Sequence, residues 1–281
     1  MKIIYTIEEM RQYTQELKDA GKTLASIDSA GDLHSGHASL IKVAKDNADV
    51  ALVSFVRIVG YSLGLKDFDK RIKQYKQKQF NLDVEFCELN GVDVLCNLPD
   101  DSWDHNPSLD ILSPRLKQIA ITRCLMPDII MWSQLLEVVR PDMSVLGQKD
   151  FYQNVVISAI IKNLNLPIQT IIAPMVRDSD GVPMNSRNNF LTAGQRRRAA
   201  HISTELQKIS EWSSYPSVNK IKDHLKLAVN NSRAHLWHID VCDASTAEKL
   251  DVIDRETAIV IGIRLGKIDL TDNILKPIGD I

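Results

Sequence analysis

The sequence has few cysteines and no long hydrophobic run, and its charges nearly cancel. Its four cysteines, Cys87, Cys96, Cys124 and Cys242, are scattered, and none belongs to a Cys-x-x-Cys or Cys-x-His pair. This usage is typical of free, mostly buried thiols in a reducing cytoplasm. The first residues, MKIIYTIEEM, carry acids where a signal peptide would be apolar, and no apolar run reaches the length of a membrane span. The sequence therefore predicts a cytoplasmic protein that does not associate with membranes.

An excess of one charge sign is also missing. The 34 Lys and Arg side chains face 36 Asp and Glu side chains, for a formal net charge of −2. This balance gives no bulk basic field for nucleic acid or an anionic membrane, although a local group of Lys and Arg can still hold a small anion. The three arginines at 196–198 are accordingly interpreted as a solvated helix face.

The 281 residues are 44% hydrophobic and 25% charged, and this length allows two modest domains. Up to residue 173, helical and strand patterns alternate. Strands are predicted at 24–27, 49–56, 92–99, 143–147 and 167–174, and helices at 7–20 with Thr6 as N-cap, from 36–38 onward, at 129–138 and over 148–166. This alternation predicts a Rossmann-like, doubly wound parallel α/β sheet over residues 1–173.

The pattern changes from residue 174 onward. The next residues are polar and rich in turn formers, and alternating stretches such as AIVIGIRLGKIDLTDN follow after a helical segment. We therefore expect a smaller α+β domain over residues 174–281. A cleft between two domains is a common place for a ligand.

One turn combines several features of a phosphate site. GDLHSGHASL, at 31–40, places His34 and His37 around Gly36, where a helix is predicted to start after a strand. Ligands of an open parallel sheet bind at the carboxyl ends of its strands, and a helix start offers free N–H groups there. The glycines permit close approach of the backbone, and the imidazoles can donate hydrogen bonds to phosphate oxygens. The alternatives are an incidental solvated pair and a metal site, although the latter lacks a third ligand at suitable spacing.

Three separated motifs follow the order of a known family. The first is the histidine turn. The second, RPDMSVLGQKDFYQN at 140–154, is similar to P-D-x-x-x-F-G-x-K-D-x-Q-Q, and the third, APMVRDSDGVPMNSRNNFLT at 173–192, to P-T-x-R-x-x-D-G-L-A-x-S-S-R-N-x-Y-L. The chain resembles a divergent member of the pantoate–β-alanine ligase family, within the HIGH-type nucleotidyltransferases. The resemblance extends over nearly the whole chain but is thin between residues 57 and 130.

This resemblance implies an ATP-dependent, AMP-forming ligase. In the family, ATP and pantoate give pantoyl adenylate and pyrophosphate, and the amine of β-alanine then displaces AMP to form pantothenate. The resemblance implies ATP and Mg²⁺ as cofactors and small molecules as substrates, while the charge balance and the lack of an apolar span predict neither nucleic acid nor membrane as a partner. It also implies a homodimer and a C-terminal domain that closes over the ATP site.

The resemblance also assigns the site residues. Residues expected to act on the phosphates in catalysis are His34, His37, Lys149, Ser186 and Arg187. Residues expected to bind the nucleotide are Gly36, Gly147, Asp150, Val176 and Met184. Residues expected to bind the acid or amine are Gln153, Arg57 and Tyr61. Asp83 lies near an acidic position of the family and is the expected metal ligand.

The acid half of the site departs from the family pattern. Asp28–Gly31 read D-S-A-G in place of P-T-M-G, and residues 55–61 read F-V-R-I-V-G-Y in place of F-V-N-P-x-Q-F. Residues 121–127 replace R-P-x-H-F-x-G, Asn185 replaces a serine, and Tyr152 replaces the first Gln of K-D-x-Q-Q. The missing Asn and Gln touch pantoate or the amine in the family. Each lost hydrogen bond costs about 1–3 kcal/mol unless it is compensated.

Three hypotheses about function follow. The first is a divergent enzyme of the family with its usual substrates. The second is the same adenylate-forming mechanism on another acid and amine, with Arg57 available to receive a second carboxylate. The third is a non-catalytic nucleotide-binding paralogue, which would bind ATP without releasing pyrophosphate when an acid is added.

Overall fold

The computed structural model describes residues 1–55, 70–99, 112–122, 126–212 and 217–276. The chain has two compact units, one made of Met1–Gly147 and Val156–Ala173, the other of Gln148–Val155 and Pro174–Ile281. The segment that follows the fifth strand thus belongs to the second unit. In the described part of the chain, no helix combines the length and the hydropathy needed to cross a membrane.

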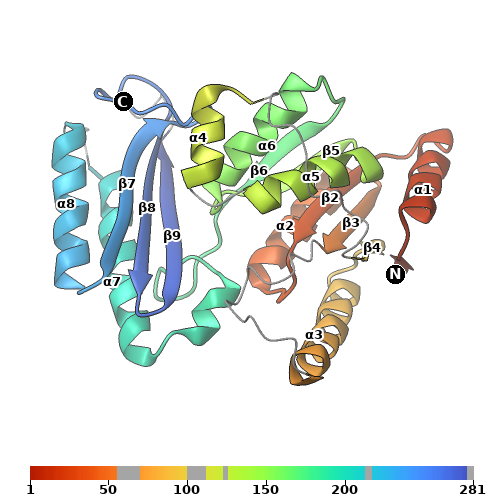
Figure 1. Ribbon diagram of the computed structural model, residues 1–281, viewed down its shortest axis with the longest axis horizontal. Coiled ribbons are helices and arrows are strands. Elements are labelled where there is room, and N and C mark those ends of the chain that lie inside the picture. Colours follow the sequence, from red (N-terminus) through yellow and green to blue (C-terminus); the bar gives the residue numbers. More distant parts are fainter. Residues whose placement is uncertain (56–69, 100–111, 123–125, 213–216, 277–281) are drawn as a thin grey trace. The chain divides into compact units, whose positions relative to one another are not determined.

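A six-stranded, all-parallel sheet forms the centre of the first unit (Figure 1). Its strands are β1 (Lys2–Ile4), β2 (Leu24–Ser29), β3 (Val50–Phe55), β4 (Val94–Cys96), β5 (Met143–Gly147) and β6 (Gln169–Ala173), in the spatial order β1-β4-β3-β2-β5-β6. The chain builds the sheet outward from β2 in one direction and then continues with β5 in the other. The carboxyl ends of β2 and β5 therefore flank the switch point, where ligands of such sheets bind. The predicted Rossmann-like class is confirmed.

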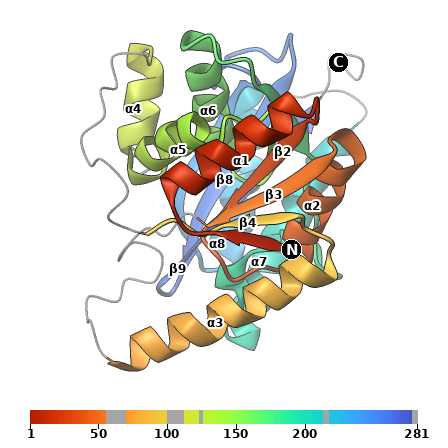
Figure 2. The ribbon, with the colours of Figure 1, turned by 90° about the vertical axis from the view of Figure 1, so that its right-hand side faces the viewer.

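Helices cover both faces of this sheet (Figure 2). One face packs against α1 (Ile7–Asp19), α5 (Met126–Val139) and α6 (Phe151–Asn163), the other against α2 (Ser35–Asn47) and α3 (Lys70–Leu89), and α4 (Pro114–Thr122) precedes α5. Side chains alternate between these faces along each strand. On β2, Leu24 accordingly belongs to the core under α1 and α5, and Ile27 to the core under α2 and α3.

Local sequence explains most of these elements. Thr6 caps α1, as predicted, and its side chain accepts a hydrogen bond from the Glu9 amide at 3.2 Å. Three elements go beyond the predicted set: β1, α3 and α4. The first has only three residues, and α3 has a polar sequence in which the apolar periodicity is weak.

The second unit has its own sheet and core. Its strands β7 (His235–Asp243), β8 (Thr257–Leu265) and β9 (Ile268–Lys276) are antiparallel, and α7 (Ala193–Ser210) and α8 (Val218–Asn231) pack against them (Figure 1). A short 3-10 helix, η2 (Ser186–Phe190), precedes α7. The predicted α+β class of the C-terminal part is confirmed.

Two smaller predictions can also be compared with the fold. Cys87, Cys96 and Cys242 are buried free thiols, as expected, whereas Cys124 lies outside the described residues. Of the three arginines, only two are exposed. Arg196 instead is half-buried and forms ion pairs with Asp178 and Asp180, both at 2.6 Å.

Thr14 provides a test of how α1 is attached to the sheet. Its buried hydroxyl donates a 2.8 Å hydrogen bond to the Val139 carbonyl at the end of α5. We expect Thr14→Val to lower the free energy of unfolding by about 1 kcal/mol, because the shape is kept and only this bond is lost. Urea unfolding of the variant and the wild type measures this difference in free energy. Thr204→Val removes an exposed, local hydroxyl bond and serves as the control, with a change expected within about 0.5 kcal/mol. Equal effects of the two substitutions would contradict the prediction.

Candidate active site

The two histidines of the turn form the cap of α2. His34 is the N-cap residue, and its Nδ1 accepts a hydrogen bond from the Gly36 amide at 3.1 Å. In return, His37 Nδ1 accepts from the His34 amide at 3.2 Å, and the two ring centroids lie 4.2 Å apart. This reciprocal arrangement is a capping box built from imidazoles. The histidine pair is therefore an ordered part of the helix start.

The backbone hydrogen bond to Nδ1 fixes the tautomer of His37. His37 Nε2 lies 3.1 Å from the hydroxyl oxygen of Ser29, the last residue of β2, and this hydroxyl also accepts from the Gly31 amide at 3.2 Å. Because Nδ1 accepts from a backbone N–H, neutral His37 carries its proton on Nε2 and donates it to Ser29. The turn thus holds an imidazole in one orientation at the carboxyl edge of the sheet.

Asp83 of α3 holds the same turn from the other side. Its two carboxylate oxygens accept hydrogen bonds from the amides of Asp32 and Leu33, at 3.1 and 2.9 Å. Gly31 has φ +91°, and a Cβ there would lie 3.0 Å from the Asp83 carboxylate, so the turn needs glycine at this position. Burial, assisted by the nearby Asp83 charge, raises the pKa of Asp32.

The geometry gives Asp83 a positioning role, because both of its oxygens are engaged by the turn. Among the described residues, no group of three or more His, Cys, Asp or Glu side chains could hold a metal ion. The metal role of Asp83 stays a prediction.

A second carboxylate lies at the carboxyl end of β2. Asp28 is paired in register with Ser54 of β3, and the Ser54 hydroxyl donates a hydrogen bond to its Oδ1. Burial raises the pKa of Asp28 to about 6, although the bond from Ser54 opposes the shift. Sequence patterns did not single out this residue as a functional one.

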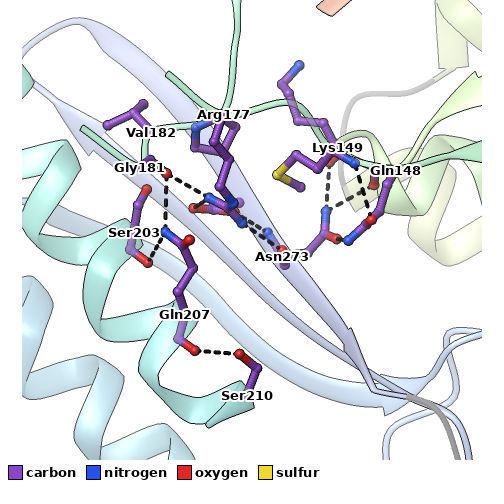
Figure 3. A network of polar contacts seen from close by, with 12 residues as sticks. Gln148, Lys149, Arg177, Gly181, Val182, Ser203, Gln207, Ser210 and Asn273 are labelled. Carbon is purple, nitrogen blue, oxygen red and sulfur yellow. Dashed lines mark hydrogen bonds and ion pairs between the residues drawn. The ribbon is translucent and has the colours of Figure 1, made fainter. Parts of the chain in front are cut away.

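In the second unit, the segment after β5 is held by β9 (Figure 3). Asn273 has no exposed surface. Its Nδ2 donates to the backbone carbonyls of Gln148 and Lys149, at 3.1 and 2.9 Å, and its Oδ1 accepts from Gln148 Nε2 at 3.2 Å. Lys149 is fixed by its backbone, while its ammonium group pairs with the adjacent Asp150 at 3.1 Å.

The third motif forms a hairpin anchored to the same strand. Arg177 pairs with Asp272 through two bonds of 2.8 and 2.9 Å and also donates to the Gly181 carbonyl (Figure 3). This hairpin brings together two of the predicted nucleotide-binding residues, since the Met184 amide donates to the Val176 carbonyl at 2.9 Å. The sequence patterns did not identify Asn273, Asp272 or Arg177, because these act through partners far away in the chain.

The remaining predicted residues differ in their surroundings. Ser186 and Arg187 begin η2, where the Asn185 side chain accepts from the Arg187 amide at 3.1 Å, so the residue that replaces the family serine acts as a helix cap. Arg187 is exposed, and Gln153 is half-buried.

Tyr152 has a structural partner in the second unit. Its hydroxyl donates a 2.5 Å hydrogen bond to buried Asp240, beside His238. Arg57 and Tyr61 lie outside the described residues, as do residues 123–125 of the altered segment.

Together, these features define a Rossmann-like α/β protein with a histidine-capped helix start at the carboxyl edge of its sheet and a second, α+β unit. The chain belongs to the pantoate-beta-alanine ligase family, whose model matches residues 2–275.

Curated relatives match along their full length. The pantothenate synthetase of Fervidobacterium nodosum is 26% identical, with 98% of this chain and 99% of the relative covered. That of Staphylococcus haemolyticus is 28% identical, with 98% of each chain covered.

Solved structures share the fold. A pantothenate synthetase from Thermus thermophilus has a TM-score of 0.80 at 18% identity, with 98% of this chain and 99% of that one covered. A pantoate-beta-alanine ligase from Francisella tularensis, described as complexed with beta-gamma ATP and beta-alanine, has a TM-score of 0.70 at 22% identity, with 98% and 97% covered.

The raised pKa of Asp28 predicts how one carboxyl group affects stability. The folded-state pKa of about 6 exceeds the ordinary value of 3.8, so folding favours the protonated form of Asp28. The stability of the wild type is therefore highest, as far as this group is concerned, below pH about 4, and it falls as the pH rises through 6. Asp28→Asn does not titrate. Its stability relative to the wild type should therefore increase between pH 4 and 8 by about 1–3 kcal/mol, as measured by urea unfolding. Parallel pH profiles of variant and wild type would exclude the shift.

Asn273 provides the test of the segment's anchor. Asn273→Ala removes three hydrogen bonds from a fully buried position and leaves two carbonyl oxygens without this donor. The expected loss of unfolding free energy is about 2–4 kcal/mol. Asn47→Ala, which removes an exposed and local amide bond, is the matched control and should change stability by less than about 0.5 kcal/mol. A small effect at Asn273 would show that the segment is held by other contacts.

Proposed function

We propose that this protein is an ATP-dependent ligase that joins pantoate to β-alanine through an adenylate. The observation that carries the proposal is the match to the family over residues 2–275, in a chain whose histidine turn is ordered at the carboxyl edge of the sheet. The related proteins support the substrates, because they are pantothenate synthetases and one is described as complexed with beta-gamma ATP and beta-alanine.

The first step is adenylyl transfer. A carboxylate oxygen of the acid attacks the α-phosphorus of ATP, and the bond to the bridging oxygen breaks, which gives the acyl adenylate and pyrophosphate. No side-chain nucleophile is needed. The chain's task is to bind both reactants and stabilise the charge on the phosphate oxygens.

Residues of the site suit this task. His34 would donate a hydrogen bond to a phosphate oxygen at the start of α2, and His37 would do the same from Nε2 by exchanging its present partner Ser29 for the phosphate. Lys149 would supply a mobile positive charge, and Arg187 and Ser186 would bind phosphate oxygens directly. Magnesium would enter as part of the MgATP substrate.

The nucleotide would be bound by the remaining family positions. Val176 and Met184, already joined by a backbone hydrogen bond, would contact the adenine. Gly36 and Gly147 allow close approach of the backbone, and Asp150 would accept hydrogen bonds from the ribose hydroxyls.

The second step forms the amide. The uncharged amine of β-alanine attacks the acyl carbon of the adenylate, AMP leaves with the electron pair of the broken C–O bond, and the nitrogen loses a proton. The binding roles of Gln153, Arg57 and Tyr61 stay predictions, as do the homodimer, the closing of residues 174–281 over ATP and the cytoplasmic location.

A second candidate function is the same mechanism on another acid and amine. The observation in its favour is Tyr152. This residue stands where the family has a glutamine, and its hydroxyl is engaged by buried Asp240. A panel of small hydroxy acids and dicarboxylic acids, offered in place of pantoate, distinguishes the two functions by which acid triggers pyrophosphate release.

Lys149 provides the test of the adenylation step. Lys149→Ala should lower the rate of pantoate-dependent pyrophosphate release by about 100-fold or more, because a charge contact to the transition state is lost. Lys42→Ala, on the exposed face of α2, is the matched control and should keep the wild-type rate. His37→Ala should reduce the rate similarly, with thermal unfolding to confirm that the fold is kept. Full adenylation by either Lys149→Ala or His37→Ala would refute the site assignment.

A further inference from the structure

A row of polar side chains crosses an otherwise apolar face of the first sheet. Ser26 and Asp28 of β2 point to the same face, because they are two residues apart. Parallel register places Ser54 of β3 beside Asp28 and Ser144 of β5 beside Ser26. The neighbours on this face, such as Leu52, belong to the hydrophobic core under α1 and α5.

Two buried serines of this row have no hydrogen-bond partners among the described residues. Ser26 and Ser144 are 1% and 0% exposed, and their hydroxyls find no hydrogen-bond partner among the residues that the structure describes. Buried hydroxyls without partners are costly, and native proteins usually satisfy them. A stabilising role in the fold therefore does not explain why this face is polar.

The row leads to the sheet's ligand-binding edge. Ser144 and Ser26 lie on β5 and β2, the two strands that flank the switch point, and Asp28 is the partly exposed member nearest the carboxyl end of β2. Ser29, the next residue, points to the opposite face and contacts His37. The histidine turn and the polar row therefore lie on opposite faces of the same strand end.

Asp28 is oriented for binding. Its Oδ1 accepts from Ser54, which fixes the carboxyl group, and none of the described residues donates a hydrogen bond to Oδ2. A carboxylate in this position attracts hydrogen-bond donors and repels other carboxylates. The group that it suits on an acid substrate is therefore a hydroxyl, while the substrate's own carboxylate lies away from it.

We propose that Asp28 is a specificity-determining residue that accepts a hydrogen bond from a hydroxyl group of the acid substrate, with Ser54 as its positioning residue. This inference rests on the proposed ligase function. It also offers a compensation for the family's Asn and Gln, which are replaced by Arg57 and Gly60 here, since the family proline at position 28 has no polar side chain.

The experiment is a double-mutant cycle in which the carboxylate is removed from the enzyme and a hydroxyl is removed from the substrate, singly and together. Pyrophosphate release is measured with the full chain, MgATP and three acids: pantoate and its two analogues that each lack one hydroxyl. The enzymes are wild type, Asp28→Ala, Asp28→Asn and Ser54→Ala. Asp46→Asn, which removes an exposed carboxylate from α2, is the matched control.

We expect wild type and Asp46→Asn to prefer pantoate over one of the analogues by about tenfold or more in kcat/KM. Asp28→Ala should reduce that preference to about threefold or less, mainly by lowering the rate with pantoate. Asp28→Asn keeps the shape and an acceptor oxygen, so it should retain an intermediate preference. Ser54→Ala should weaken the preference less than Asp28→Ala, because it frees the carboxylate without removing it. Lys149→Ala should lower the rates with all three acids and leave their ratio unchanged.

The failures of the two proposals are distinguishable. An undiminished preference in Asp28→Ala, or in Asp28→Asn if the alanine variant does not fold, would overturn the role of Asp28 while the ligase function stands. No pyrophosphate release by wild type with any of the three acids would overturn the pantoate-ligase function and, with it, this inference. A parallel measurement of ATP binding would then show whether the nucleotide half of the site is intact.

Discussion

The hydrogen bonds between Asp83 and the turn after β2 are the contact on which the histidine turn of the first unit depends. A turn that leaves a parallel strand and immediately starts a helix presents several backbone N–H groups without partners. Here the carboxylate of α3 binds two of them, at Asp32 and Leu33. The imidazoles of His34 and His37 satisfy the next ones. Each histidine thus has its orientation set by the backbone, a preorganisation that would suit the proposed phosphate chemistry.

In the second unit, the second and third motifs depend on β9 in the same way. Arg177 and Asp272 tie the hairpin of the third motif to this strand, and Asn273 ties the Gln148–Lys149 backbone to it. Flexible side chains such as that of Lys149 are therefore carried on a backbone that is held by a fully buried amide. The ammonium group of Lys149 can change position while the backbone that carries it stays fixed.

The sequence predicts the parallel sheet well, because short, continuous apolar runs such as 49–56, which alternate with helical patterns, are typical of strands buried on both sides. Thr6 could be predicted as a cap because its signal is local. The roles of Asp83, Asn273 and Asp28 could not be predicted. Asp83 lies 50 residues from Leu33 of the turn that it binds, and Asn273 lies 125 residues from Gln148. Asp28 looks like an ordinary turn residue until the register with Ser54 is known. The histidine pair was predicted from its spacing, but its capping geometry depends on ring orientations that spacing alone does not determine.

The path of the chain between the two units limits how this architecture can be modified in evolution. Gln148–Val155 belongs to the second unit although the residues on both sides of it belong to the first. A short segment that includes Lys149 therefore interrupts the sequence of the first unit but belongs to the second. A gene fusion that exchanged the C-terminal part for an unrelated one would leave this segment without Asn273. The two units are thus expected to be inherited together, and a change of substrate is expected to arise by substitutions such as those along β2 rather than by domain shuffling.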